Sequence, residues 1–348
     1  MRRGAGKAAE PGATSRQRNM WRSITRVWAV ALLTSTEGLR QPAFFLLLVT
    51  AAGLTAFSPS FAFFHLGEEA KMVTDLGLST VLTFATLLAL LTASSTVTDE
   101  IEGRTALTML SKPLRREEFL LGKYLGVACT ACGLVVLMSI VLLVTLRGQQ
   151  YDAIQDPFFV FGLLSGLALG VTLFGLLLVL RLLFGRGITM LKAFWLSYGA
   201  AAVFVLVFLR LKAPATVQWE WRILLGLFSI CLHTCVISAV AVTLATRLTL
   251  VQAAIGTAAF FLLGHASGAL VAPLRDAHHK LGVAGSVVRA ILPDLDQFNI
   301  TDALATAYID KPVPIPWDIM ASSALYALLY GIALLALGAA LFSRRELG

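Results

Sequence analysis

The sequence predicts an all-α integral membrane protein, a polytopic helical bundle of about eight transmembrane helices. Hydrophobic residues make up 57% of the 348 residues and charged residues only 14%, whereas soluble globular proteins carry about 25% charged residues. The mean hydropathy is +0.80. Apolar runs long enough to cross a bilayer also recur along the chain, separated by short polar segments.

The formal net charge is +8, and the cations cluster at the N-terminus and beside the apolar runs. Cations in these places hold the adjoining segments on the cytoplasmic side and contact anionic lipid. The sequence has no basic stripe interleaved with exposed aromatic residues, so membrane lipid is an expected partner and nucleic acid is not.

The N-terminal part divides into a polar tail and an amphipathic helix. Residues 1–20 have no apolar periodicity and lack the apolar core of a signal peptide, which predicts a disordered basic tail. In residues 21–41 apolar side chains recur at helical spacing among Arg and Glu residues, which predicts an interfacial helix in the headgroup plane. Pro42 then begins the transmembrane domain, residues 42–348.

The transmembrane domain contains eight apolar runs, and an even number of spans places both termini in the cytoplasm. The runs cover residues 43–64, 76–97, 124–146, 157–184, a further stretch ending near 209, 223–245, 250–272 and 319–342. Residues 273–317 form the longest polar excursion, a predicted external loop. Gly162, Gly166 and Gly170 leave one helical face without side chains, so we expect that face to pack against another helix.

Cysteine and histidine residues inside the apolar runs have two interpretations each. Cys129 and Cys132 form a CxxC that could bind a metal or a thiol, but no second CxxC or neighbouring His completes a site, which favours simple packing. His233 and His265 could relay protons or bind a metal. With no carboxylate predicted inside the same spans, hydrogen bonding to a neighbouring helix is the favoured role, and we expect no bound metal.

Other sequence patterns argue against an enzyme. The chain has no HExxH motif and no GxxxxGK[ST] phosphate loop. We therefore expect no catalytic residues and no cofactor bound by this chain, and energy for any driven process must come from another subunit.

Residues 99–118 are the one long segment of dense charge between two spans, and their cations predict a cytoplasmic location. Asp99, Glu100 and Glu102 suit a helix start, an apolar patch follows, and Pro113 breaks the helix. One interpretation is an ordinary solvated loop. The other is a short amphipathic helix, rigidly joined to two spans, that acts as a lever.

This segment resembles the signature of ABC-2 type permeases, the membrane subunits of ABC transporters with the type V exporter fold. The matching residues are Glu100, Glu102, Arg104, Thr105, Leu110, Ser111, Lys112, Pro113, Leu114, Arg116, Gly122 and Lys123. The resemblance extends to the helix before the first span, to residues 292–298 and to the closing residues 342–346.

The resemblance implies that residues 99–110 form a coupling helix that docks onto a separate ATPase subunit, and that residues 113–123 transmit its motion into the following span. The implied coupling residues are Asp99, Glu100, Glu102, Arg104, Thr105, Leu110, Pro113, Arg116 and Lys123. Two permeases, as a homodimer or heterodimer, would assemble with two ATPases that bind ATP and Mg²⁺.

The implied activity is transport, in the export direction, across the bacterial inner membrane. Because the family usually has six spans, residues 157–209 are interpreted as an inserted helical hairpin. The alternative function is a stand-alone secondary carrier or ion-coupled permease, which predicts intramembrane carboxylates.

Overall fold

The computed structural model describes residues 11–62, 69–98, 115–150, most of 165–179, 190–212, 222–267, 293–300, 304 and 317–343. Within these ranges every regular element is helical. The helices long and apolar enough to cross a membrane are Pro42–Ser60, Lys71–Val97, Arg116–Arg147, Arg222–Ala245 and Trp317–Phe342. The predicted polytopic helical membrane fold is therefore confirmed. The count of about eight spans stays a prediction, because the other described apolar helices, Ala168–Leu177, Ala193–Phe208 and Leu250–His265, are shorter.

The first helix, α1 (Pro11–Arg40), starts ten residues before the start predicted at residue 21. Pro11 suits the first position of a helix, and residues 13–20 contain neither Gly nor Pro to break it. The predicted tail therefore overlaps this helix from residue 11 onward, and residues 1–10 lie outside the described part. After Gln41, α2 (Pro42–Ala62) begins a new direction.

The two faces of α1 differ in the way that an interfacial helix requires. Val30, Ala31 and Thr34 are buried against the bundle. Large apolar side chains on the other side are exposed, among them Trp21 and Trp28 at 61% and 57%. Such amphipathic aromatic side chains suit the boundary between lipid and water.

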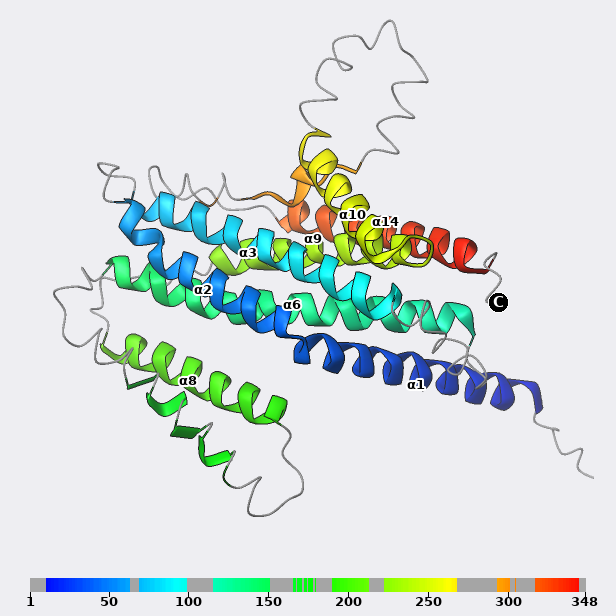
Figure 1. The fold of residues 1–348 in the computed structure, drawn as a ribbon, viewed down its shortest axis with the longest axis horizontal. Coiled ribbons are helices and arrows are strands. Elements are labelled where there is room, and N and C mark those ends of the chain that lie inside the picture. Colours follow the sequence, from blue (N-terminus) through cyan, green and yellow to red (C-terminus); the bar gives the residue numbers. More distant parts are fainter. Residues whose placement is uncertain are drawn as a thin grey trace, which may run out of the picture.

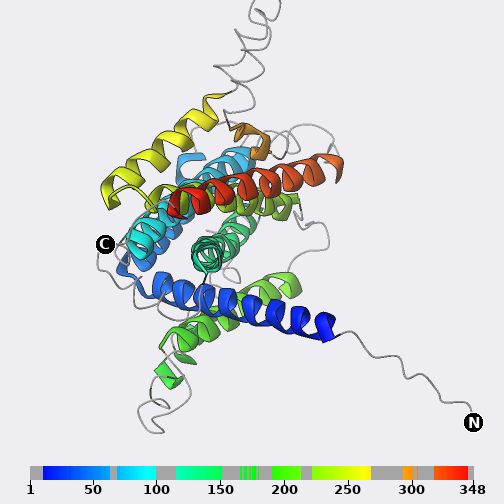
Figure 2. The ribbon, with the colours of Figure 1, turned by 90° about the vertical axis from the view of Figure 1, so that its right-hand side faces the viewer.

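The long helix α6 (Arg116–Gln150) lies in the middle of the bundle and is seen end-on in Figure 2. It packs against α1, α2, α3 (Glu69–Ala93), α9 (Arg222–Ala245) and α14 (Trp317–Ser343), which surround it in Figures 1 and 2. Its 35 residues would extend about 52 Å, well beyond an apolar bilayer core of about 30 Å. One helix thus runs without a break from Arg116 through the third predicted span, residues 124–146.

Helix α8 (Met190–Lys212) and residues 165–179 lie at the edge of the bundle (Figure 1). A Cβ atom at Gly166 would lie 2.1 Å from the Val205 side chain, and one at Gly170 would lie 3.0 Å from Ala201 Cβ. Both glycines therefore face α8 at close approach. Gly162 falls outside the described residues, and the assignment of residues 157–209 as an inserted hairpin stays a prediction.

Two other predicted boundaries differ from the structure. Helix α3 begins at Glu69, so Asp75, predicted in an external connection, lies inside a membrane span. Helix α10 (Leu250–His265) is only 16 residues long, about 24 Å, which is short for a full crossing.

Part of the predicted external loop, residues 293–300, is folded into the bundle around the short 3₁₀ helix η2 (Asp296–Phe298). Leu295 N donates to Gly264 O at 3.3 Å, and Ser229 Oγ donates to Phe298 O at 2.6 Å. These contacts fasten the segment to α10 and α9. Residues 268–292, 301–303 and 305–316 lie outside the described part.

Glycines on α6 allow α1 to approach closely. A Cβ atom at Gly122 would lie 2.6 Å from Val30 Cβ, and one at Gly126 would lie 2.5 Å from Thr34 Cβ. Real Cβ atoms do not come this close, so only glycine permits this distance between the two helices. Thr130 Oγ1 lies one turn further along α6 and donates to Ser35 O at 3.4 Å.

We expect Gly126→Ala to lower the stability of the protein by about 1–3 kcal/mol, because the added methyl group overpacks the contact between α1 and α6. Thermal unfolding of the purified protein in detergent measures the effect. Gly53→Ala is the matched control, because nothing lies within 4 Å of its added Cβ and alanine favours a helix by about 0.5–1 kcal/mol. Equal shifts for both variants would contradict the packing argument.

Candidate functional site

The predicted coupling residues fall mostly outside the described part of the chain. The residues that lie in this undescribed segment, 99–114, are Asp99, Glu100, Glu102, Arg104, Thr105, Leu110 and Pro113. Arg116 and Lys123 are described, and so is the backbone on both sides of the segment. The contacts at these two ends define the candidate site.

The segment is preceded by a π-helical turn, η1 (Ser94–Thr98), which closes α3. Such wide turns are rare and occur frequently at functional sites. Ser95 Oγ and Thr96 Oγ1 both donate to Thr92 O, at 3.3 and 2.7 Å. Hydroxyl side chains that bond to the preceding turn compete with the backbone ladder, which favours an irregular helix at this position.

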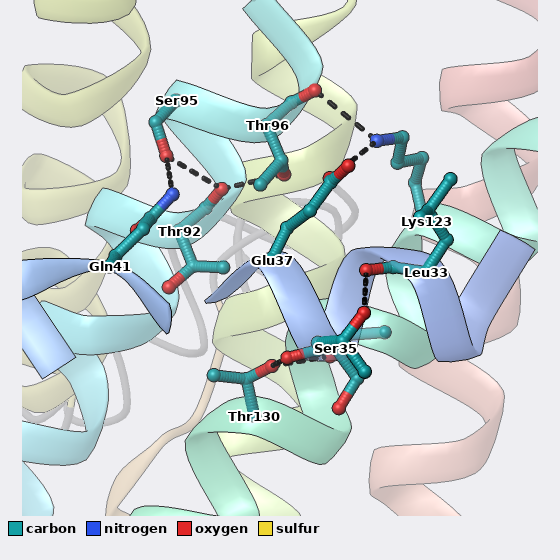
Figure 3. A network of polar contacts seen from close by, with 11 residues as sticks. Leu33, Ser35, Glu37, Gln41, Thr92, Ser95, Thr96, Lys123 and Thr130 are labelled. Atoms are coloured by element: carbon teal, nitrogen blue, oxygen red, sulfur yellow. Dashed lines mark hydrogen bonds and ion pairs between the residues drawn. The ribbon is translucent and has the colours of Figure 1, made fainter. Parts of the chain in front are cut away.

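Lys123 of α6 reaches this turn from below, as Figure 3 shows. Its Nζ donates to Thr96 O at 3.4 Å and lies 3.9 Å from Glu37 Oε2 of α1. The residue is only 1% exposed, and Nζ sits 5.8 Å from the centre of the Phe119 ring. A buried ammonium is costly unless such groups surround it. The ammonium group of Lys123 therefore connects α6, on which it lies, to η1 and to α1.

A second contact holds η1 from the other side. Gln41, in the bend between α1 and α2, donates from Nε2 to Ser95 Oγ at 2.8 Å (Figure 3). Gly38 adds a close approach, because a Cβ there would lie 2.9 Å from the side chains of both Thr92 and Thr130. The C-terminal end of α1 is thus packed directly against the end of α3.

The first turn of α6 is tied to α1. The Glu118 carboxylate accepts from the backbone N–H of Arg115 at 3.3 Å and from Arg26 Nη1 at 3.4 Å. A carboxylate in this position satisfies a free N–H group and favours the helix start. The residues that follow the charged segment are therefore fixed to the interfacial helix as well.

Arg116 makes a different contact from the one that the sequence suggests. Its Nη1 donates to Phe342 O at 3.1 Å, and its guanidinium lies 5.6 Å from the centre of the Phe342 ring. Arg247 donates to Leu341 O in the same final turn of α14. Two cations thus satisfy carbonyl groups at a helix C-terminus, where the helix dipole favours positive charge. Whether Arg116 also contacts an ATPase stays a prediction.

Glu37 and Gln41 were not predicted as site residues. They belong to the predicted interfacial helix, whose polar side chains were expected only to face the headgroups and water. One signal could have found them. Gly122 and Gly126 have the same spacing as the glycines at 162, 166 and 170, and therefore mark a face of α6 for close helix packing. A helix docked on that face brings its side chains next to Lys123.

The histidines and cysteines also come together in pairs. The His233 and His265 rings lie 5.4 Å apart, centre to centre, and Asp75 lines the same cavity. The spans of His233 and His265 contain no carboxylate, as predicted, but α3 begins earlier than predicted and brings Asp75 to the cavity that both histidines line. Cys132 Sγ and Cys235 Sγ are 4.0 Å apart across α6 and α9. Among the described residues, no three metal-ligating side chains are arranged to hold a metal ion.

The helices define a multi-pass membrane protein. The sequence matches the family described as ABC-2 family transporter protein over residues 52–248, which is more than half of the chain. The chain belongs to this family and is a membrane permease component of an ABC transporter. No curated protein matches the sequence.

We expect Lys123→Met to speed amide hydrogen exchange in residues 94–98 by about tenfold or more, since a hydrogen bond to a charged group contributes about 1.5–3 kcal/mol. Met nearly preserves the side-chain length, so the change removes mainly the charge. Exchange monitored by mass spectrometry provides the measurement. Lys71→Met, at the opposite end of α3, is the matched control, and an equal effect there would show that Lys123 does not hold η1.

Proposed function

We propose that this permease exports its substrate and is driven by separate ATPase subunits that dock onto residues 99–110. The observation that supports the proposal is the position of Lys123, whose ammonium contacts η1 through Thr96 and α1 through Glu37. Both ends of the charged segment are attached to one buried ammonium, one through Thr96 O and the other through α6 itself. A partner that displaces the segment must therefore move α3, α6 and α1 together.

The π-helical turn offers a way to convert that displacement into rotation. A change from π-helix to α-helix at η1 would shift the following residues by one position, about 100° around the helix axis. Thr96 O would then leave Lys123, and the buried ammonium would lose this hydrogen bond. We infer that the two arrangements of η1 correspond to two states of the transporter.

The charge distribution supports a cytoplasmic position for this end of the bundle. Arg26, Arg115, Arg116, Lys123 and Arg247 all lie near η1 or near the adjoining end of α14. Cations on this scale favour the cytoplasmic side. The proposed setting is a bacterial inner membrane with both termini inside, a permease dimer and two ATPases that bind ATP and Mg²⁺.

A second candidate function is a stand-alone carrier coupled to an ion gradient. One observation favours it, because Asp75 is an intramembrane carboxylate next to two histidines, the feature that such a carrier requires. Transport into vesicles that contain this chain alone, driven by a proton or sodium gradient, would support the carrier over the ATP-driven permease.

The docking proposal predicts that replacing both Glu102 and Arg104 by alanine lowers the ATPase activity stimulated by the permease by about a hundredfold or more, since two charge-assisted contacts of about 1.5–3 kcal/mol each are lost. The measurement uses permease and ATPase co-purified into lipid nanodiscs. Glu117→Ala, an exposed carboxylate just beyond the segment, is the control. Unchanged stimulation together with unchanged co-purification would overturn the assigned docking site.

A further inference from the structure

A polar cavity of about 390 Å³ lies at the end of α3 opposite η1. Its walls come from α3, α9 and α10, and residues 295–300 close it. The volume falls in the range of about 300–1,000 Å³ that is typical of small-molecule sites. The cavity is separate from the proposed docking segment, because residues 83–93 of α3 and the turn η1 lie between the two.

The closing segment is held firmly in place. Besides the bonds to α9 and α10 described above, Gln297 O accepts from Ser323 Oγ of α14 at 3.3 Å, and Asp294 N donates to Tyr326 OH at 3.0 Å. The Leu295 side chain packs against Gly264, where a Cβ would lie only 2.4 Å from it. Residues 295–300 therefore form a well-ordered wall of the cavity, held by hydrogen bonds and side-chain packing.

His233 points to a ligand in this cavity. The side chain is 1% exposed, and neither ring nitrogen has a hydrogen-bond partner among the described residues. Two aromatic rings hold it edge-on, Phe261 at 5.7 Å and Phe298 at 6.0 Å. Buried polar groups nearly always have a partner, so a fixed and unsatisfied imidazole on a cavity wall indicates a bound group.

The neighbouring histidine contributes an acceptor. His265 Nδ1 lies 3.0 Å from Phe261 O, and since a carbonyl only accepts, Nδ1 carries the proton. Nε2 of His265 is then a hydrogen-bond acceptor, and neutral His233 supplies another. Asp75 lines the same cavity, so a carboxylate and two imidazoles lie together on its walls.

The charge around the cavity favours a cation. Asp75 lines it, and none of the described lining residues is Lys or Arg. Asp294 and Asp296 belong to the segment that forms one wall, and burial raises the pKa of the Asp296 carboxyl, with Asp294 adding to the effect. An anionic ligand would meet carboxylates here. A metal ion is disfavoured, because the described residues contain no suitable group of three ligands.

The remaining walls are apolar and come from side chains such as Leu78, Leu82, Ile230 and Phe298. We propose that the cavity binds a small molecule with an ammonium group and a short hydrocarbon body. The ammonium donates to Asp75 and to the two imidazoles, and the hydrocarbon part lies against the leucine and phenylalanine side chains.

The test uses the full-length protein in lipid nanodiscs without an ATPase, so its outcome does not depend on the proposed docking. The probe is 2-phenylethylammonium, compared with neutral 2-phenylethanol and anionic 3-phenylpropionate. The readout is the rate at which diethyl pyrocarbonate modifies His265, measured by peptide mass spectrometry. We expect the ammonium compound alone to slow the modification, by about tenfold at saturation.

Asp75→Asn should weaken the apparent affinity for the ammonium compound by about tenfold or more, because a charge-assisted contact is lost. Asp318→Asn, an exposed carboxylate at the start of α14, should leave it unchanged. Equal protection by the alcohol or the carboxylate, or no protection by any probe, would overturn the proposal. Protection by Zn²⁺ alone would also overturn it and identify a metal site. The comparison of probes on the unmodified protein stands even where Asp75→Asn fails to fold.

Discussion

The close approach of α1 to α6 is the constraint on which the polar site depends. Gly122 and Gly126 remove the side chains that would keep the two helices apart, and this brings Glu37 within 3.9 Å of the Lys123 ammonium. Lys123 is in turn too deeply buried to be satisfied by water, so it must bond to protein atoms. The packing of small residues thus determines the electrostatics of the junction.

The sequence predicted the parts of this fold that depend on local chemistry. Hydropathy alone identifies five described helices as spans. Glu117 and Glu118 lie in the first turn of α6, where acidic side chains suit the positive end of the helix dipole. The amphipathic pattern before Pro42 likewise corresponds to a helix with one exposed apolar face. These features follow from solvent preference and helix propensity, which each residue carries with it.

The parts that were missed depend on contacts between distant segments. The sequence predicts Asp75 outside the span, because it follows the charged residues Glu68, Glu69 and Lys71. In the structure, however, helix α3 begins at Glu69, and Asp75 lies on the wall of the cavity. From the sequence alone, Glu37 is expected to be a solvent-exposed charge. Only the packing of α6 against α1 brings it next to Lys123. The hydroxyl side chains of Ser95 and Thr96 favour an irregular helix at Ser94–Thr98, but they do not identify a π-helical turn, because its other partners, Gln41 and Lys123, come from distant parts of the chain.

Helix α3 connects the two polar sites of an otherwise apolar bundle. Asp75 lies near one end and Thr96 near the other, about 31 Å apart along a continuous helix. A helix packed on several sides transmits a displacement along its axis better than it bends, because its neighbours are close-packed. A rearrangement at η1 would therefore reach the Asp75 wall of the cavity, whereas the wall formed by residues 293–300 is bonded to α9, α10 and α14. A displacement of α3 relative to the bonded segment 293–300 would change the shape of the cavity, and such a change would couple its affinity to the state of η1.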